Sequence, residues 1–304
     1  MATDNILDKK LIETPFVYHY TRVDALFSIL EGCRKKGKKY LPFRAGCAYN
    51  SNDSREMELG YEAVKEILPQ YEKSCAKSLN LSEVYSKSEY EDQCKKLFFQ
   101  KPKDGMVEMS TIPYTISFSC KRDFLPMWSM YGNDKRGVCL KFNLGFLIDS
   151  LNTEACFVYY KGDKENIISD YLFPQLYKTS FILNDKIVLS INDKIQILSL
   201  ICDCISPFVK CDDWAYESEF RIVSNVHYGQ EFNGKLGINR IQLALPKIKI
   251  DDYEIIQIEP GSLEEIIIGP LANYNVLEHV LRNELKECLL NHVEITPSSI
   301  QITK

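Results

Sequence analysis

Three ionisable residues stand at alternate positions of one short segment. Glu217, Glu219 and Arg221 follow one another two residues apart, so in an extended strand over residues 214–223 their side chains would leave the same face. Two carboxylates about 7 Å apart raise each other's pKa unless a cation or a ligand hydroxyl is close. The segment therefore indicates either a catalytic acidic pair with Arg221 as its counter-ion, or an ion-paired strand face with a structural role.

A histidine near the N-terminus is the second candidate for proton chemistry. His19 is the only histidine in the first two-thirds of the chain, and Thr21 shares its face of the strand predicted at residues 16–21. An imidazole titrates near neutral pH, and a hydroxyl beside it suits a ribose or an amide. A lone strand histidine is also commonly a hydrogen-bonded core residue. We expect His19 to meet Glu217 and Glu219 across one shared pocket.

Two further pairs of residues leave a structural and a functional interpretation open. Asn52 and Asp53 precede a predicted helix, where they either cap it or point an amide and a carboxylate into a cleft. Trp128 and Tyr131, three residues apart, lie on one side of a short predicted helix. They either pack in the core or stack on a planar ligand ring.

The elements that must position these residues alternate irregularly along the chain. Apolar and β-branched patterns predict strands at 16–21, 115–119, 137–142, 214–223, 241–245, 255–259 and 265–268, and helices at 24–31, 57–99, 126–132, 187–205 and 276–291. Gly32 is interpreted as the C-cap of the first helix. There is no βαβ rhythm and no internal repeat. The pattern predicts an α+β fold, with a mixed, mainly antiparallel sheet core and helical insertions.

The length and composition predict one globular domain. A chain of 304 residues with 45% hydrophobic and 26% charged residues is too large for a disulfide knot and too apolar for a disordered protein. We expect residues 1–304 to form a single elaborated domain. Its expected parts are a core at about 14–272, helical insertions at about 56–105 and 165–208, and a C-terminal helix at about 275–292.

Charge and cysteine content restrict the setting in which the chain acts. The net charge of −5 excludes a generally basic nucleic-acid coat, although the basic run at 34–39 is either a solvated loop or a docking patch for phosphate or nucleic acid. The longest apolar stretch, at 195–209, is interrupted by polar residues and a proline, so no membrane span is expected. With 11 cysteines and no secretory leader, the cysteines are expected to be reduced and the location cytoplasmic.

Several common catalytic motifs are missing from the sequence. It contains no glycine-rich phosphate loop, no G-x-S-x-G elbow and no H-E-x-x-H zinc motif. Cys202, Cys204 and Cys211 do not form a zinc site, because residues two apart on a helix point about 200° apart. No metal is therefore predicted as a bound cofactor.

Seven motifs, in one order along the chain, resemble the bacterial domain-of-unknown-function 2971 family (DUF2971). The resemblance covers roughly residues 16–270, and its most specific part is the tryptophan–glutamate motif at 210–221. The motifs are Tyr18-His19-Tyr20-Thr21, Asn52-Asp53-x-x-Glu56, Ser117-Phe118-Ser119, Pro126-Met127-Trp128-Ser129-x-Tyr131, Gly137-Val138-Cys139-Leu140-x-Phe142, Lys210-x-x-x-Trp214-x-Tyr216-Glu217-x-Glu219-x-Arg221 and Ile266-Ile267-Ile268-Gly269. This family carries no established activity.

A second, more distant resemblance, to ADP-ribosyltransferase-like folds, implies a chemistry. Such enzymes use a His or Arg on the first strand, a Tyr or Ser-Thr-Ser segment midway and a late Glu on a strand. Here Phe118 replaces the middle Thr. The resemblance implies Glu217, Glu219 and His19 as catalytic residues and NAD as the substrate. The residues expected to hold the dinucleotide are His19, Thr21, Asn52, Asp53, Ser119, Trp128, Tyr131 and Arg221.

Three functions from different classes follow from these residues. The first is an NAD-using ADP-ribosyltransferase-like or NAD glycohydrolase-like enzyme, with a protein or nucleic-acid acceptor and a role as a toxin or anti-phage defence effector. The second is a metal-dependent phosphodiesterase or nuclease with Asp53, Glu56, Glu217, Glu219 and His19 as ligands. The third is a non-catalytic module that binds a ligand between Trp128, Tyr131 and Trp214.

Overall fold

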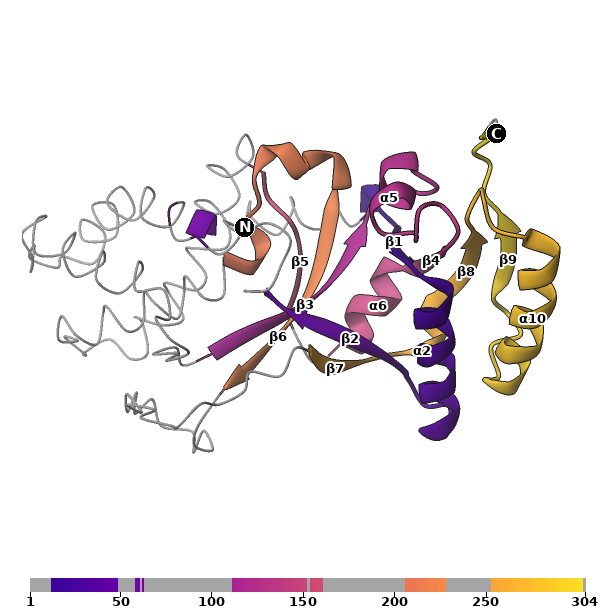
Figure 1. Cartoon of the computed structure of the whole chain (residues 1–304). Helices are drawn as coiled ribbons and strands as arrows, with labels where there is room; N and C mark the ends of the chain where they lie inside the picture. Colours follow the sequence, from indigo (N-terminus) through magenta and orange to yellow (C-terminus); the bar gives the residue numbers. More distant parts are fainter. Residues whose placement is uncertain are drawn as a thin grey trace, which may run out of the picture.

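The fold is α+β and is built on one large sheet (Figure 1). In this computed structural model the described residues are 12–48, 58–60, 62, 111–151, 154–160, 206–227 and 253–302. The α-helices of four residues or more are α2 (Val23–Lys35), α5 (Leu125–Met130), α6 (Leu144–Ser150) and α10 (Tyr274–Glu287), and the 3-10 helices are η4 (Ser206–Phe208), η5 (Asp212–Glu217) and η6 (Pro260–Ser262). The strands are β1 (Phe16–Thr21), β2 (Leu41–Cys47), β3 (Thr111–Ser119), β4 (Val138–Asn143), β5 (Glu154–Phe157), β6 (Glu219–His227), β7 (Tyr253–Ile258), β8 (Leu263–Ile268) and β9 (Glu294–Pro297).

The sheet forks along one edge of β3. Its main path runs β5-β6-β3-β1-β4-β8-β9, while β2 also pairs with β3 and carries β7 on its other side. β1 pairs with β3 at Ser119, and β2 pairs with β3 at Thr115 and Tyr114. All the strand pairs are antiparallel except β8 with β9. The mainly antiparallel sheet expected from the sequence is therefore confirmed.

The strand registers assign every side chain of the central strands to one of two faces. Directly paired residues point to the same face, and neighbours along a strand alternate. Tyr18 pairs with Ser119, which pairs with Glu219, so these three side chains share one face, called here the Glu219 face. His19 pairs with Leu140 and lies on the opposite face, called here the His19 face.

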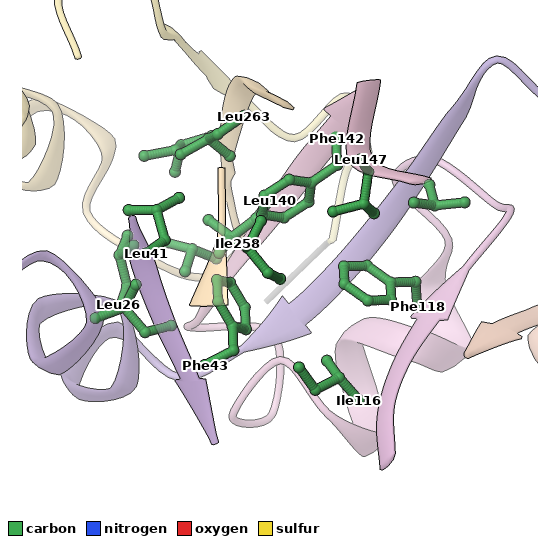
Figure 2. Close-up of a cluster of buried hydrophobic side chains, with 14 of the residues drawn as sticks. Leu26, Leu41, Phe43, Ile116, Phe118, Leu140, Phe142, Leu147, Ile258 and Leu263 are labelled. Atoms are coloured by element: carbon green, nitrogen blue, oxygen red, sulfur yellow. The ribbon is translucent and has the colours of Figure 1, made fainter. Parts of the chain in front are cut away.

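The main core covers the His19 face. Phe118 of β3 lies edge to face against Phe142 of β4, and Phe142 lies in the same way against Phe43 of β2, with ring centroids 5.6 and 5.8 Å apart. Figure 2 shows these rings converging where the two arms of the fork separate. Helices α2, α6 and α10 contribute further buried side chains to this cluster. A fully buried residue of this size contributes roughly 1.5–3 kcal/mol, so this layer dominates the packing of the fold.

Helix α2 extends beyond the end predicted from its glycine. The helix runs to Lys35, and Gly32 lies inside it rather than at its C-cap. A Cβ atom at Gly32 would lie only 2.4 Å from Cγ of Pro42. The glycine is therefore required by the close approach of α2 to β2, and the chain turns at Gly37, where φ is +71°.

The other predicted elements have different outcomes. The strand at 16–21 is confirmed with its predicted ends. The strands at 115–119, 137–142, 255–259 and 265–268 and the short helix at 126–132 are confirmed with shifted ends. The C-terminal helix ends earlier than predicted, at Glu287, and β9 follows it. The helix at 187–205, the strand at 241–245 and nearly all of the insertion at 56–105 lie outside the described residues. No helix within the described ranges is long and apolar enough to cross a bilayer.

Candidate functional site

The segment predicted as one strand at 214–223 contains a helix, a turn and a strand. Residues Asp212–Glu217 form the 3-10 helix η5, whose acidic first turn complements the positive end of its backbone dipole. Ser218 follows with φ of 47°, in the left-handed region, and β6 begins at Glu219. The prediction that Glu217 lies on the strand is therefore wrong, whereas Glu219 and Arg221 do share a strand face.

The turn brings the two carboxylates closer together than a strand would. The Ser119 hydroxyl donates to the carbonyl oxygen of Glu217 at 2.6 Å, and the Cys120 amide donates to the Ser218 carbonyl oxygen at 2.7 Å. Both bonds tie the turn to the end of β3. Ser119, expected to contact a dinucleotide, is almost fully buried and instead holds the backbone of Glu217.

The ammonium group of Lys210 lies between the two carboxylates. Its Nζ atom is 2.5 Å from Oε2 of Glu217 and 3.1 Å from Oε2 of Glu219. Oε1 of Glu217 accepts a hydrogen bond of 2.6 Å from the Tyr131 hydroxyl. The side chains of both glutamates are 3% exposed and that of Lys210 is 8% exposed. These contacts define a buried cluster, called here the acidic-pair network.

Arg221 completes the network on the side of Glu219. Its Nε atom donates to Oε1 of Glu219 at 2.6 Å, and its NH2 group donates to Oε2 at 2.9 Å. This two-pronged geometry is the strongest arginine–carboxylate contact. The NH1 group donates to the carbonyl oxygen of Pro207 in η4. Arg221, expected as a dinucleotide ligand, is therefore an ion-pair partner of Glu219.

Burial and charge shift the pKa values of this network in ways that matter for proton transfer. Burial raises the pKa of Glu219 to about 7, against the opposing effect of Lys210. Burial alone would lower the pKa of Lys210, but the carboxylates of Glu219 and Glu217 raise it, so its amine stays charged. Burial and the bond to Glu217 raise the pKa of Tyr131, which keeps its hydroxyl a donor. The network thus combines a fixed cation with a carboxyl group that exchanges its proton near neutral pH.

The network lies close to the surface of the described structure. Ser117, an exposed residue of β3, hydrogen-bonds to Glu219 through its side chain. Trp214 and Tyr216 of η5 are partly exposed and their ring centroids are 6.2 Å apart. The ammonium of Lys210 lies 4.9 Å from the centre of the Trp214 ring. Hydroxyl and aromatic groups therefore flank the buried charges on the way to solvent.

The structure does not bring His19 to the acidic pair. The imidazole lies on the His19 face, against the rings of Phe43 and Phe118 at centroid distances of 5.3 and 5.5 Å. Its Nδ1–H donates to the carbonyl oxygen of Ser117 at 2.9 Å. That carbonyl lies between the pairings of β3 with β1 and with β2, at the point where the sheet forks.

The hydrogen bond to Ser117 gives His19 a structural role at the fork. Burial lowers the pKa of His19, so the imidazole is neutral at neutral pH. Thr21 shares the His19 face, as predicted from alternation. The expected pocket shared by His19 with both glutamates is wrong, because alternation along β1 directs the imidazole away from the face that carries Glu219.

The two aromatic candidates on α5 and after it have different surroundings. Trp128 is fully buried, lies edge to face against Tyr20 at 5.0 Å and donates its indole N–H to Asp123 at 2.8 Å. A ligand ring has no access to it in this conformation. Tyr131 joins the acidic-pair network through its hydroxyl. The three-residue spacing of Trp128 and Tyr131 in the sequence therefore identifies one core residue and one site residue.

The sequence assigns no role to one network residue, Lys210, or to Tyr160 beside the network. Lys210 appeared only as the first residue of the tryptophan–glutamate motif, and Tyr160 was not singled out, although its hydroxyl accepts the Glu219 amide at 3.1 Å. A lysine four residues before a tryptophan is a weak signal in a sequence. The candidates Asn52 and Asp53 lie outside the described residues. Within the ranges that the structure describes, no group of three His, Cys, Asp or Glu residues is arranged to hold a metal ion.

Comparison with known proteins gives one match. No curated protein and no solved structure matches the chain significantly. The model of a family described as "Protein of unknown function (DUF2971)" matches residues 127–222. All five side chains of the acidic-pair network, from Tyr131 to Arg221, fall inside this range, and His19 falls outside it. The resemblance to this family that the sequence motifs indicated is therefore confirmed over residues 127–222.

Proposed function

We propose that this chain cleaves the N-glycosidic bond between ribose and nicotinamide in NAD, as a transferase or a glycohydrolase. The observation that carries the proposal is the pair of buried carboxylates, Glu217 and Glu219, held around one ammonium group with a tyrosine hydroxyl on one of them. Enzymes that cleave glycosidic bonds usually use two carboxyl groups in unequal surroundings. NAD as the substrate follows from the resemblance to ADP-ribosyltransferase-like folds.

The proposed reaction has two steps. The bond from ribose carbon to ring nitrogen breaks with its electron pair on nitrogen, which converts the cationic ring into neutral nicotinamide. The ribosyl carbon, now cation-like, takes an oxygen from water or from an acceptor hydroxyl, and the proton released passes to a carboxylate. Because burial raises the pKa of Glu219 to about 7, this carboxyl group can accept that proton at neutral pH.

Glu217 is the better placed residue to contact the sugar. Its Oε1 atom is bonded to the neutral Tyr131 hydroxyl, whereas its Oε2 atom and both oxygens of Glu219 face cations. A ribose hydroxyl can replace a tyrosine hydroxyl without loss of an ion pair. A preorganised carboxylate in a site that excludes water stabilises a developing positive charge most strongly.

Nicotinamide release from NAD is the direct test. The purified chain should release nicotinamide, measured by chromatography, and Glu217→Gln and Glu219→Gln should each lower the rate about 100-fold or more. Glu265→Gln is the matched control, because Glu265 is also a buried glutamate paired with an arginine. Its rate should stay within about threefold of the wild type. No release by the wild-type chain would reject the proposal.

The charge balance of the network favours a second candidate, a non-catalytic ligand-binding module. Two glutamates, Lys210 and Arg221 carry formal charges that cancel, and each carboxylate oxygen has a partner. Such closed ion networks also occur for structural reasons. Under this alternative Glu217→Ala lowers the stability of the chain and removes no turnover. The roles as a toxin or defence effector, and the metal-dependent nuclease that needs Asp53, stay predictions.

A further inference from the structure

We infer that Lys210 is a positioning residue that holds the Glu217 and Glu219 carboxylates around its ammonium group and so opposes proton uptake at this site. The inference rests on the proposed function for the reaction that the pair serves. It also makes a claim about the resting protein that does not depend on turnover. Lys210 acts through these two carboxylates and does not touch the substrate in this assignment.

The ammonium group has two charged hydrogen bonds and one aromatic neighbour. A lysine ammonium has three N–H donors. Two donate to Glu217 and Glu219, at 2.5 and 3.1 Å, and the nitrogen lies over the Trp214 ring, 4.9 Å from its centre. The group is therefore fixed in one place, between two carboxylates and an aromatic face.

The backbone of Lys210 is anchored independently of this ammonium. Its amide donates to the Tyr159 carbonyl oxygen at 3.0 Å, and Val209 forms a parallel bridge with Tyr159. The residue is thus tied to the chain that follows β5. Its side chain then crosses to η5 and β6, so the ammonium adds charged contacts between segments that are also joined by the backbone bond from the Val158 amide to the Glu219 carbonyl oxygen, at 2.8 Å.

The charges around the pair determine what happens when the ammonium is removed. The groups that face it are Tyr131 from the loop after α5, Tyr160 after β5, Tyr216 and Glu217 from η5, and Glu219 and Arg221 from β6. With Lys210 present, two carboxylates face two cations. Without it, two buried carboxylates face one cation, and the excess negative charge favours uptake of one proton.

A carboxyl titration in the full-length chain tests this coupling. With glutamate labelled by 13C at the carboxyl carbon, the resonances of Glu217 and Glu219 can be assigned by Glu→Gln substitutions and followed against pH. Lys210→Met should move the protonation midpoint of the pair up by about 2 pH units, and Lys210→Arg should bring it back to within about 1 unit of the wild type. An unchanged midpoint in Lys210→Met would overturn the inference.

A matched control and a second variant keep the test decisive. Lys141 is another partly buried lysine, paired with Glu264 at 3.0 Å, and Lys141→Met should leave the midpoint of the pair unchanged. If Lys210→Met does not fold, the charge-balanced double variant Lys210→Met/Glu219→Gln should restore folding. A double variant that also fails to fold counts against the inference.

The titration and the enzyme assay fail in different ways. Absence of nicotinamide release by the wild-type chain rejects the proposed reaction, while the shift of the midpoint is still measured. If the chain is active, the pH profile of nicotinamide release in Lys210→Met should move to higher pH together with the carboxyl midpoint. An active variant with a shifted midpoint and an unshifted rate profile would remove Lys210 from the reaction.

Discussion

Glu219 and Glu265 are two buried glutamates at opposite ends of one row across the sheet. The row runs from Glu219 through Ser119, Tyr18 and Lys141 to Glu265, on the Glu219 face. Four strand spacings separate its ends, or about 19 Å. Both glutamates are paired with an arginine, so the same residue type meets the same partner twice on one surface of the sheet.

The two sites differ in how much water reaches the partners. Arg122, which pairs with Glu265 at 2.8 Å, has a side chain that is 46% exposed, whereas that of Arg221 is 3% exposed. Burial alone would raise the pKa of Glu265, but hydrogen bonds from Arg122 and Thr296 lower it. At Glu219 burial prevails and raises the pKa. An arginine partner therefore does not fix the protonation state of a glutamate, and its burial makes Glu219 the carboxyl group suited to proton exchange.

The largest contrast is expected when the arginines are removed. Arg221→Met leaves two buried carboxylates facing only Lys210 and should lower the free energy of unfolding by about 3–5 kcal/mol. Arg122→Met removes a half-exposed ion pair and should lower it by less than about 1 kcal/mol. Urea unfolding of both variants measures the difference. Equal losses would mean that the two sites are energetically alike, and the comparison would fail.

The pH dependence of stability should have opposite signs at the two sites. Because the pKa of Glu219 is higher in the folded chain, its protonated form stabilises the fold at low pH, and this contribution is lost as the pH rises from 4.5 to about 7. The stability of the wild type relative to Glu219→Gln should therefore fall by about 3 kcal/mol over that interval. Unfolding at a series of pH values measures this change.

Glu265 provides the opposite trend as a control. Its pKa is lower in the folded chain, so its contribution is present above the unfolded value and is lost as the pH falls. The stability of the wild type relative to Glu265→Gln should therefore decrease on acidification. The same sign of dependence in both variants would contradict the assignment of Glu219 as the proton-exchanging carboxyl group.

A hydroxyl donor at each of the two sites allows a finer comparison. Tyr131→Phe removes a bond of 2.6 Å to Glu217 inside the buried network and should cost about 2 kcal/mol. Thr296→Val removes a bond of 2.6 Å to Glu265 and should cost about 1 kcal/mol, because water can reach that site beside Arg122. Thermal and urea unfolding measure both. A larger loss at Thr296 would reverse the order of the two sites.

The sequence predicted the strands and one face of the site because these depend on local alternation. Glu219 and Arg221 stand two apart on a real strand, and their shared side follows from the period of two. Glu217 could not be placed in this way, because the left-handed turn at Ser218 and its bonds to β3 arise from tertiary contacts. The alternating pattern continues through that turn and hides it.

Long-range pairing decided the remaining features of the site. Lys210 reaches the glutamates only because the chain after β5 lies beside β6, which no spacing in the sequence reveals. The face of His19 was predicted correctly with respect to Thr21, but its relation to the face of Glu219 depends on the register of β1 against β3. A one-residue change in that register would exchange the two faces, so the sequence alone could not decide which residues meet.

Replacement of His19 is expected to have the smallest effect, and it separates the two faces of the sheet. His19→Leu keeps an apolar side chain against Phe43 and Phe118 and removes the bond to the Ser117 carbonyl, which should cost about 1 kcal/mol. Since the imidazole lies on the opposite face from Glu219, any nicotinamide release should stay within about threefold of the wild type. Urea unfolding and the NAD assay on the same preparation give both values. A large loss of turnover with little loss of stability would indicate that His19 takes part in the reaction. That role would require a conformation in which β1 pairs with β3 in a different register.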